Sequence, residues 1–258
     1  MIAATSIHIS LGQVAATLVL VAVAASVSLW WRVGLEGDLG VAVLRSFVQL
    51  TAVGYLIHGI FRSNSLWLVA LLLAVMVAFA TFTARGRARS VPNATVPILI
   101  ALTVAGGVTV ALVLILGVFK ATPRYLVPVG GMVIGNAMTA TAVTLNRLAD
   151  EVRSSAGQIE ATLALGATAR QAATGLMTRS LRSGMIPLID STKTTGIVFF
   201  PGTMVGMLLA GADPLDAVRL QLILLWALLG AVALSAVIAT VLGYRGFFTT
   251  AHQLREPA

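Results

Sequence analysis

Long apolar runs separated by short polar stretches dominate the pattern along this chain. The hydrocarbon core of a bilayer is about 30 Å thick, and a helix needs roughly 20 apolar residues to cross it. The expected spans are seven runs near residues 9–31, 39–61, 66–83, 96–119, 126–147, 186–210 and 219–243. The second, fifth and sixth contain polar residues, so six spans is the alternative count. The pattern predicts an all-α integral membrane protein.

Composition agrees with this pattern. The chain has 258 residues, of which 58% are hydrophobic and 10% are charged, whereas soluble domains carry about 25% charged residues. A water-soluble core is therefore excluded, and we expect a single transmembrane domain over residues 1–258. The first apolar run is too long for a signal peptide and lacks a basic start, so it predicts an uncleaved span. Without cysteine, the chain offers no disulfide, thiolate ligand or Cys nucleophile.

The net charge of +8 is distributed as membrane topology requires. If the chain crosses seven times, eleven arginines fall on one side, and the other side receives Arg62, Lys120, Arg124 and Arg219. The positive-inside rule then predicts an outer N-terminus and a cytoplasmic C-terminus. The charges form no basic face with interleaved aromatics, so we expect no nucleic-acid partner.

The longest polar interruption runs from Asn146 to Met185. Its residues 150–183 are rich in helix formers. Gly166 fits a helix stop, and Thr168 fits the N-cap of a new helix. The segment 148–184 therefore predicts a helix, a sharp turn and a second helix at the cytoplasmic surface.

Two interpretations of this segment remain open. A basic amphipathic helix can rest on lipid headgroups. The order of residues favours another role: Glu160 and Ala161, with Gly166 six residues after the Glu, resemble the EAA coupling loop of ABC-transporter permeases. Thr162 replaces an alanine of that motif, and Pro187 comes later than the motif expects. The resemblance implies that this loop docks into a cleft of an ATPase subunit, with the coupling residues Glu160, Ala161, Leu165, Gly166, Ala167 and Thr168.

Further segments resemble the FetB family of ABC permeases over about residues 39–253. They are Arg45–Leu50, Gly131–Met138, Ile186–Gly196, Pro201–Gly206 and Ala210–Pro214. The resemblance implies a multi-pass protein of the bacterial inner membrane, linked to iron export, with plant relatives linked to aluminium tolerance. Two positions depart from the family pattern: Thr203 replaces a methionine, and Thr139 replaces an asparagine.

Several polar residues lie within the expected spans. A charge at the bilayer centre costs about 2.5–3.5 kcal/mol on insertion scales, so such residues face protein or water, or pair. Asp190 and Lys193 are helical neighbours, and they either orient the helix as a neutral pair or form a gate. Arg45 and Gln49 share one face of the second span. For Arg45 we favour a structural or gating role over substrate binding.

A metal site is not assigned by the sequence. Asn136 lies on a methionine-containing span with Met138, and Met204 lies on the next one. Thioethers suit soft ions, although methionines in apolar helices also act as packing filler. Pro201 and Gly202 predict a break in the sixth span, and broken helices line cavities in transporters. Asn136, Met138, Pro201 and Met204 are therefore candidate pathway residues.

The chain lacks the G-x-x-x-x-G-K-[ST] phosphate loop and is not expected to be an enzyme. ATP and Mg²⁺ would bind a separate ATPase, and no cofactor is expected here. A two-site ATPase needs two docking loops, which predicts a permease homodimer. The expected function is a membrane permease subunit that exports metal ions, where the resemblance to the FetB family implies iron and the direction of transport. The alternatives are an ion-gradient transporter or channel, an ABC permease for a non-metal solute, and a membrane-anchored scaffold.

Overall fold

The computed structural model describes residues 10–255, which divide into two compact units. One comprises the described residues up to Asn64 together with 209–211, and the other comprises residues 65–208 and 212–255. The regular elements of the described residues are helices, with isolated bridges at Thr195–Phe199 and Phe248–Leu254. The predicted all-α class is confirmed.

The first unit contains α1 (Leu11–Ala16), α2 (Leu18–Trp30) and α3 (Glu36–Ser63). The turn between α2 and α3 is held by Ser28, which is buried. Its hydroxyl donates to Glu36 Oε2 at 2.9 Å and accepts from the Leu35 N–H at 2.9 Å. One side chain thus connects the end of α2 to the start of α3, which explains why the chain reverses here.

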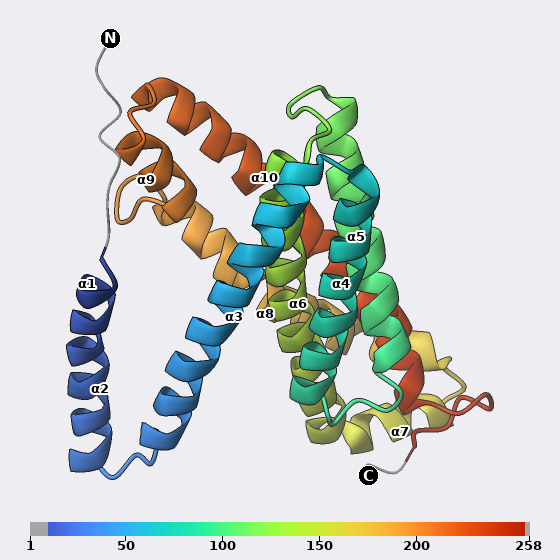
Figure 1. The fold of residues 1–258 in the computed structure, drawn as a ribbon. Coiled ribbons are helices and arrows are strands. Elements are labelled where there is room, and N and C mark those ends of the chain that lie inside the picture. The colour runs from blue at the N-terminus through green and yellow to red at the C-terminus, as the bar shows by residue number, and fades with distance from the viewer. Residues whose placement is uncertain (1–9, 256–258) are drawn as a thin grey trace. The chain divides into compact units, whose positions relative to one another are not determined.

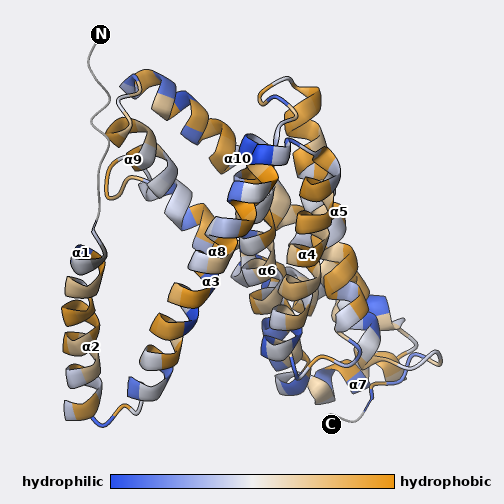
Figure 2. Ribbon diagram, viewed as in Figure 1, coloured by the Kyte–Doolittle hydropathy of each residue, from blue (hydrophilic) through white to orange (hydrophobic). Residues whose placement is uncertain are grey.

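The second unit is a helix bundle built around α6 (Pro123–Ser154), which packs against α4 (Leu66–Arg87), α5 (Thr95–Ile115), α8 (Ala169–Thr194) and α10 (Pro214–Gly243). Figure 1 shows α4, α5 and α6 side by side. The remaining elements are α7 (Ala156–Ala164), α9 (Gly202–Leu209) and η1 (Tyr244–Phe247). In Figure 2, α4 and α5 are mostly hydrophobic, and hydrophilic residues gather where α6 ends near α7.

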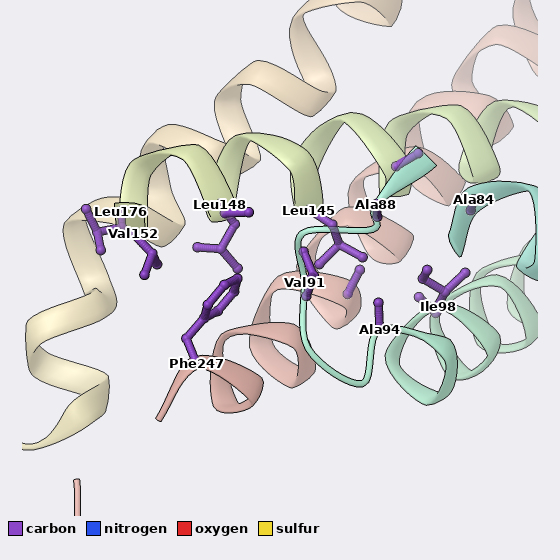
Figure 3. Close-up of a cluster of buried hydrophobic side chains, with 14 of the residues drawn as sticks. Ala84, Ala88, Val91, Ala94, Ile98, Leu145, Leu148, Val152, Leu176 and Phe247 are labelled. Atoms are coloured by element: carbon purple, nitrogen blue, oxygen red, sulfur yellow. The ribbon is translucent and has the colours of Figure 1, made fainter. Parts of the chain in front are cut away.

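The main core of this unit lies toward the α7 end of the bundle. Figure 3 shows the Phe247 ring pointing toward Leu148 of α6, with Val152 and Leu176 beside them. Small residues such as Ala84 contribute on α4. Because these side chains are small or interlocked, α4, α6 and α8 come close together, as close packing requires.

Six helical segments of the described residues are long and apolar enough to cross a membrane. They are Gly12–Trp30, Glu36–Ser63, Leu66–Arg87, Thr95–Ile115, Pro123–Ser154 and Pro214–Phe247. Six of the seven predicted spans overlap these segments. The remaining predicted span, 186–210, overlaps none of them, so the number of such segments agrees with the alternative count of six spans.

The segment predicted as the sixth span, 186–210, is interrupted, as Pro201 and Gly202 predict. Helix α8 ends at Thr194, and α9 starts at Gly202. The intervening chain turns at Gly196, whose φ is +85°, and the Gly196 N–H donates to the Phe199 carbonyl at 2.9 Å. Pro201, which has no N–H to donate, precedes α9. The predicted break before Gly202 is confirmed, but it begins six residues earlier than Pro201, at Thr195.

Helix α8 nevertheless runs antiparallel to α6 along most of its length. Glu151 of α6 contacts Arg179 of α8, and a Cβ placed on Gly184 would meet Thr144. Asn136 and Ser191 line one cavity further along. The polar segment predicted as 148–184 is therefore the end of α6, α7 and most of α8.

Candidate coupling site and transport cavity

The turn after α7 is built by Gly166. Its N–H donates to the Leu163 carbonyl at 2.9 Å, and the Ala167 N–H donates to the Thr162 carbonyl at 3.3 Å. This pair of bonds is the Schellman motif, which satisfies carbonyls left over at a helix end. The φ of Gly166 is +90°, a conformation that a side chain strongly disfavours. The predicted helix stop is confirmed.

The start of α8 is fixed by Thr168. Its hydroxyl accepts from the Gln171 N–H at 3.3 Å, while Gln171 Oε1 accepts from the Thr168 N–H at 2.8 Å. This is a reciprocal capping box. The predicted N-cap is confirmed, and helix, turn and helix occur in the predicted order.

The predicted docking residues lie on the surface of this turn. Glu160, Ala161, Gly166 and Thr168 are exposed, and Ala167 is partly buried. Leu165 is 90% exposed. Ile159 of α7 and Ala169 of α8 are buried in the main core, and they anchor the segment to the bundle. A rigidly seated turn therefore presents an unburied leucine at its tip.

Glu151, a residue that sequence reasoning missed, connects the helices beside this turn. Its carboxylate lies 2.7 Å from Arg147 of α6 and 2.7 Å from Arg179 of α8. The Glu151 side chain is 8% exposed, whereas both arginines are about half exposed. The four-residue spacing from Arg147 to Glu151 could have indicated part of this cluster. The contact to Arg179 could not be predicted, because 28 residues separate it from Glu151.

A cavity of about 210 Å³ lies between α6, α8 and α10. Its lining residues are Asn136, Thr139, Ala140, Val143, Gly184, Pro187, Leu188, Ser191 and Val232. The Asn136 amide donates to the Met132 carbonyl at 2.8 Å, and the Thr139 hydroxyl donates to the Gly135 carbonyl at 3.2 Å. The cavity therefore offers hydroxyl and amide oxygens on an otherwise apolar wall.

Buried oxygens occur on the same helices. Among the described residues, the hydroxyls of Thr141 and Thr144 on α6 and the amide oxygen of Gln221 on α10 have no hydrogen-bond partner. Thr144 lies against Gly184, which lines the cavity. Since buried polar atoms normally find a partner, this part of the bundle has unused capacity for water or a polar ligand.

Of the predicted pathway residues in the second unit, Asn136 lines the cavity. Asp190 and Lys193 form the predicted ion pair, at 3.3 Å, with side chains 61% and 70% exposed. Met138 packs against the main core instead. Met204 is buried on α9, and Pro201 lies in the break before it.

The other two predicted residues, Arg45 and Gln49, are one turn apart on α3 of the first unit, and both are exposed. Within residues 10–255, no group of three or more His, Cys, Asp or Glu side chains could hold a metal ion. The structure therefore brings the docking residues together, and it places one pathway candidate at a cavity.

Comparison with known proteins identifies relatives along nearly the whole chain. UPF0014 membrane protein STAR2 of rice is 42% identical over 246 residues, covering 95% of this chain and 86% of the relative. The Arabidopsis protein ALUMINUM SENSITIVE 3 is 40% identical, with 93% and 88% covered. The Escherichia coli protein named probable iron export permease protein FetB is 37% identical, with 94% and 93% covered.

No solved structure shows significant similarity to this chain. The family described as uncharacterised protein family UPF0014 matches residues 11–248. With a match of that extent, and relatives of 37–42% identity, this all-α membrane protein belongs to the UPF0014 family.

Proposed function

We propose that this chain is the membrane permease subunit of an ABC transporter that exports metal ions, with iron as the first candidate. A separate cytoplasmic ATPase would bind ATP and Mg²⁺ and drive it. The observation that carries the proposal is the turn at Leu165, where a 90% exposed leucine is held on a rigid helix–turn–helix. The same turn presents Glu160, Ala161 and Gly166 at the surface, the residues that resemble the coupling loop of ABC permeases.

The way the turn is attached supports a coupling role. Only Ser155 separates α6 from α7, and residues 165–168 join α7 to α8. Both α6 and α8 then continue into the bundle, where they line the cavity. The buried carboxylate of Glu151 connects the same two helices. A partner that moves the turn would therefore move the helices at the cavity.

The remaining parts of the proposal follow from charge and similarity. The α7 end carries most of the arginines, so it would lie in the cytoplasm, with α8 and α9 together forming a seventh crossing. Two docking turns would come from a homodimer. The name of the Escherichia coli relative points to iron export, and the apolar helices support a location in the bacterial inner membrane. The cavity at Asn136 is the candidate pathway.

Coupling is tested by co-expressing the chain with candidate ABC ATPase subunits from the same genome and co-purifying the complex. We expect Leu165→Asn, Glu160→Ala and Gly166→Val to reduce recovery of the ATPase. Leu215→Asn is the matched control, because Leu215 is also strongly exposed, at 65%, but lies at the opposite end of the bundle. Undiminished complex formation in all three turn variants would overturn the docking role.

Substrate is tested separately in inside-out vesicles that contain both subunits. We expect ATP-dependent uptake of Fe(II), measured against Mn(II), Al(III) and organic solutes. Asn136→Leu should lower this uptake while ATPase co-purification is retained. Transport of none of the metals would overturn the metal assignment and leave the docking result standing.

A further inference from the structure

We propose that a second cavity, at the α7 end of the bundle, binds a phosphate ester such as the headgroup of an anionic phospholipid. The cavity has a volume of about 390 Å³. It is enclosed by the α4–α5 connection, the end of α6, the start of α7 and the C-terminal turn. Its lining residues are Arg89, Ser90, Pro92, Ala149, Val152, Arg153, Ala156, Phe247, Leu254 and Arg255.

Three arginines from three separate segments converge on this cavity, namely Arg89, Arg153 and Arg255. Guanidinium groups bind phosphate oxygens through paired, charge-assisted hydrogen bonds. Within residues 10–255, the acid paired with them is Asp150, whose carboxylate lies 3.4 Å from Arg153. The local charge therefore remains positive, and the cavity favours an anion.

Backbone carbonyls orient two of these arginines. Arg89 Nε donates to the Gly86 carbonyl at 3.0 Å, and Arg255 Nε donates to the Phe248 carbonyl at 3.2 Å. These bonds use one nitrogen of each guanidinium and hold its plane. The two terminal nitrogens are the pair that a phosphate group requires.

The C-terminal turn that supplies Arg255 is itself well fixed. The Arg255 N–H donates to the Phe247 carbonyl at 2.8 Å, and Phe248 and Leu254 form a bridge. Gly246 lies so close to the α4–α5 connection that a Cβ there would stand 2.5 Å from the Pro92 carbonyl oxygen. Arg255 on the C-terminal turn and Arg89 on the α4–α5 connection are therefore fixed relative to each other.

The rest of the wall is apolar, and it favours an ester over a bare anion. Val152 and Phe247 are buried members of the main core, and Leu254 packs against it. A lipid headgroup combines a phosphate with glycerol and acyl carbons, which such a surface accommodates. Basic pockets between membrane helices on the cytoplasmic side bind anionic headgroups in this way.

The test uses the full chain, delipidated in detergent, with dioctanoyl phosphatidylglycerol as the probe. Binding is measured by native mass spectrometry and by the rise in melting temperature. We expect R89Q/R255Q to weaken binding by about tenfold or more, since each arginine near anionic lipid contributes measurably. The control R87Q/R245Q removes the same charge from the same end without touching the cavity lining, and it should retain binding.

Two further arms make the outcome decisive. Ala156→Leu, which fills the cavity while keeping every charge, should also weaken binding. Inorganic phosphate and glycerol 3-phosphate distinguish the sources: if they bind as well as the lipid and with the same dependence on Arg89 and Arg255, the site takes free phosphates. Equal losses in R89Q/R255Q and R87Q/R245Q, or equal binding of dioctanoyl phosphatidylcholine, would overturn the site.

Discussion

Gly184 lies where α8 comes closest to α6. A Cβ at this position would overlap Thr144 Oγ1 and would stand 3.0 Å from the Ala140 carbonyl oxygen. The Thr144 hydroxyl belongs to a side chain that can rotate, whereas the Ala140 carbonyl belongs to the α6 backbone and can yield only if the two helices move apart by a few tenths of an ångström. Glycine fits here without displacing its neighbours, and the reason is space and not φ.

We expect Gly184→Ala to destabilise the protein by about 1–3 kcal/mol, as overpacking of a tight core does. Gly175→Ala on the same helix is the control, because a Cβ there meets only the Arg179 side chain at 3.6 Å. It should be neutral or stabilising by up to about 1 kcal/mol. Melting in detergent measures both, and equal melting temperatures would contradict the close contact.

In the ion cluster at Glu151, we expect removal of the arginines to cost more stability than removal of the carboxylate charge. Removing both arginines, in R147Q/R179Q, leaves an unpaired carboxylate that is 8% exposed, which costs about 3 kcal/mol or more. Glu151→Gln leaves two half-exposed arginines that water can solvate, so it should cost less. Arg219→Gln, which breaks an exposed pair, should change stability by less than about 1 kcal/mol. The reverse order in thermal melts would show that Glu151 is not effectively buried.

At the scale of elements, helix ends that depend on neighbouring residues could be predicted from the sequence. Features that depend on contacts between distant residues could not. The stop at Gly166 and the cap at Thr168 depend on residues within one turn, so the sequence predicted both. The break at Thr195 depends on a bond between Gly196 and Phe199, and it was placed too late. The contact between Glu151 and Arg179 depends on the packing of two helices, and no spacing indicated it.

The capping box makes a prediction about the start of α8. Thr168→Ala removes the hydroxyl that accepts from the Gln171 N–H and should destabilise the first turn by about 1 kcal/mol. Faster amide hydrogen exchange at residues 169–171 measures this. Thr178→Ala is the control, since its hydroxyl donates to the Thr174 carbonyl within the helix and caps nothing. If both variants exchange alike, the cap contributes nothing to the turn.

At the scale of the whole molecule, the α4–α5 connection and α7 lie at one end of the second unit, because both line the arginine cavity. Alternation of the helices puts the α5–α6 connection at the other end. The membrane-spanning class was predictable from apolar runs alone. The number of crossings was not, because α8 carries five charged residues and still packs along α6.

The absence of cysteine allows a direct test of this arrangement. Single cysteines at Asn93 and Gln158 should react with a membrane-impermeant thiol reagent only after the cells are permeabilised. A cysteine at Ala121 should react in intact cells. Labelling of Asn93 and Gln158 from opposite sides would contradict the bundle, and labelling of both in intact cells would invert the proposed orientation.

The unbroken length of α8 has a mechanical consequence. Its 26 residues, at about 1.5 Å each, make a rod of about 39 Å that contains Pro187. One end of this rod is the capped turn at Thr168, and the other is the break at Thr195. A push at the turn would therefore travel along the Thr168 end of α8 to the cavity, and the first point at which the helix can bend is Pro187, a cavity-lining residue that has no N–H for the helical hydrogen-bond ladder.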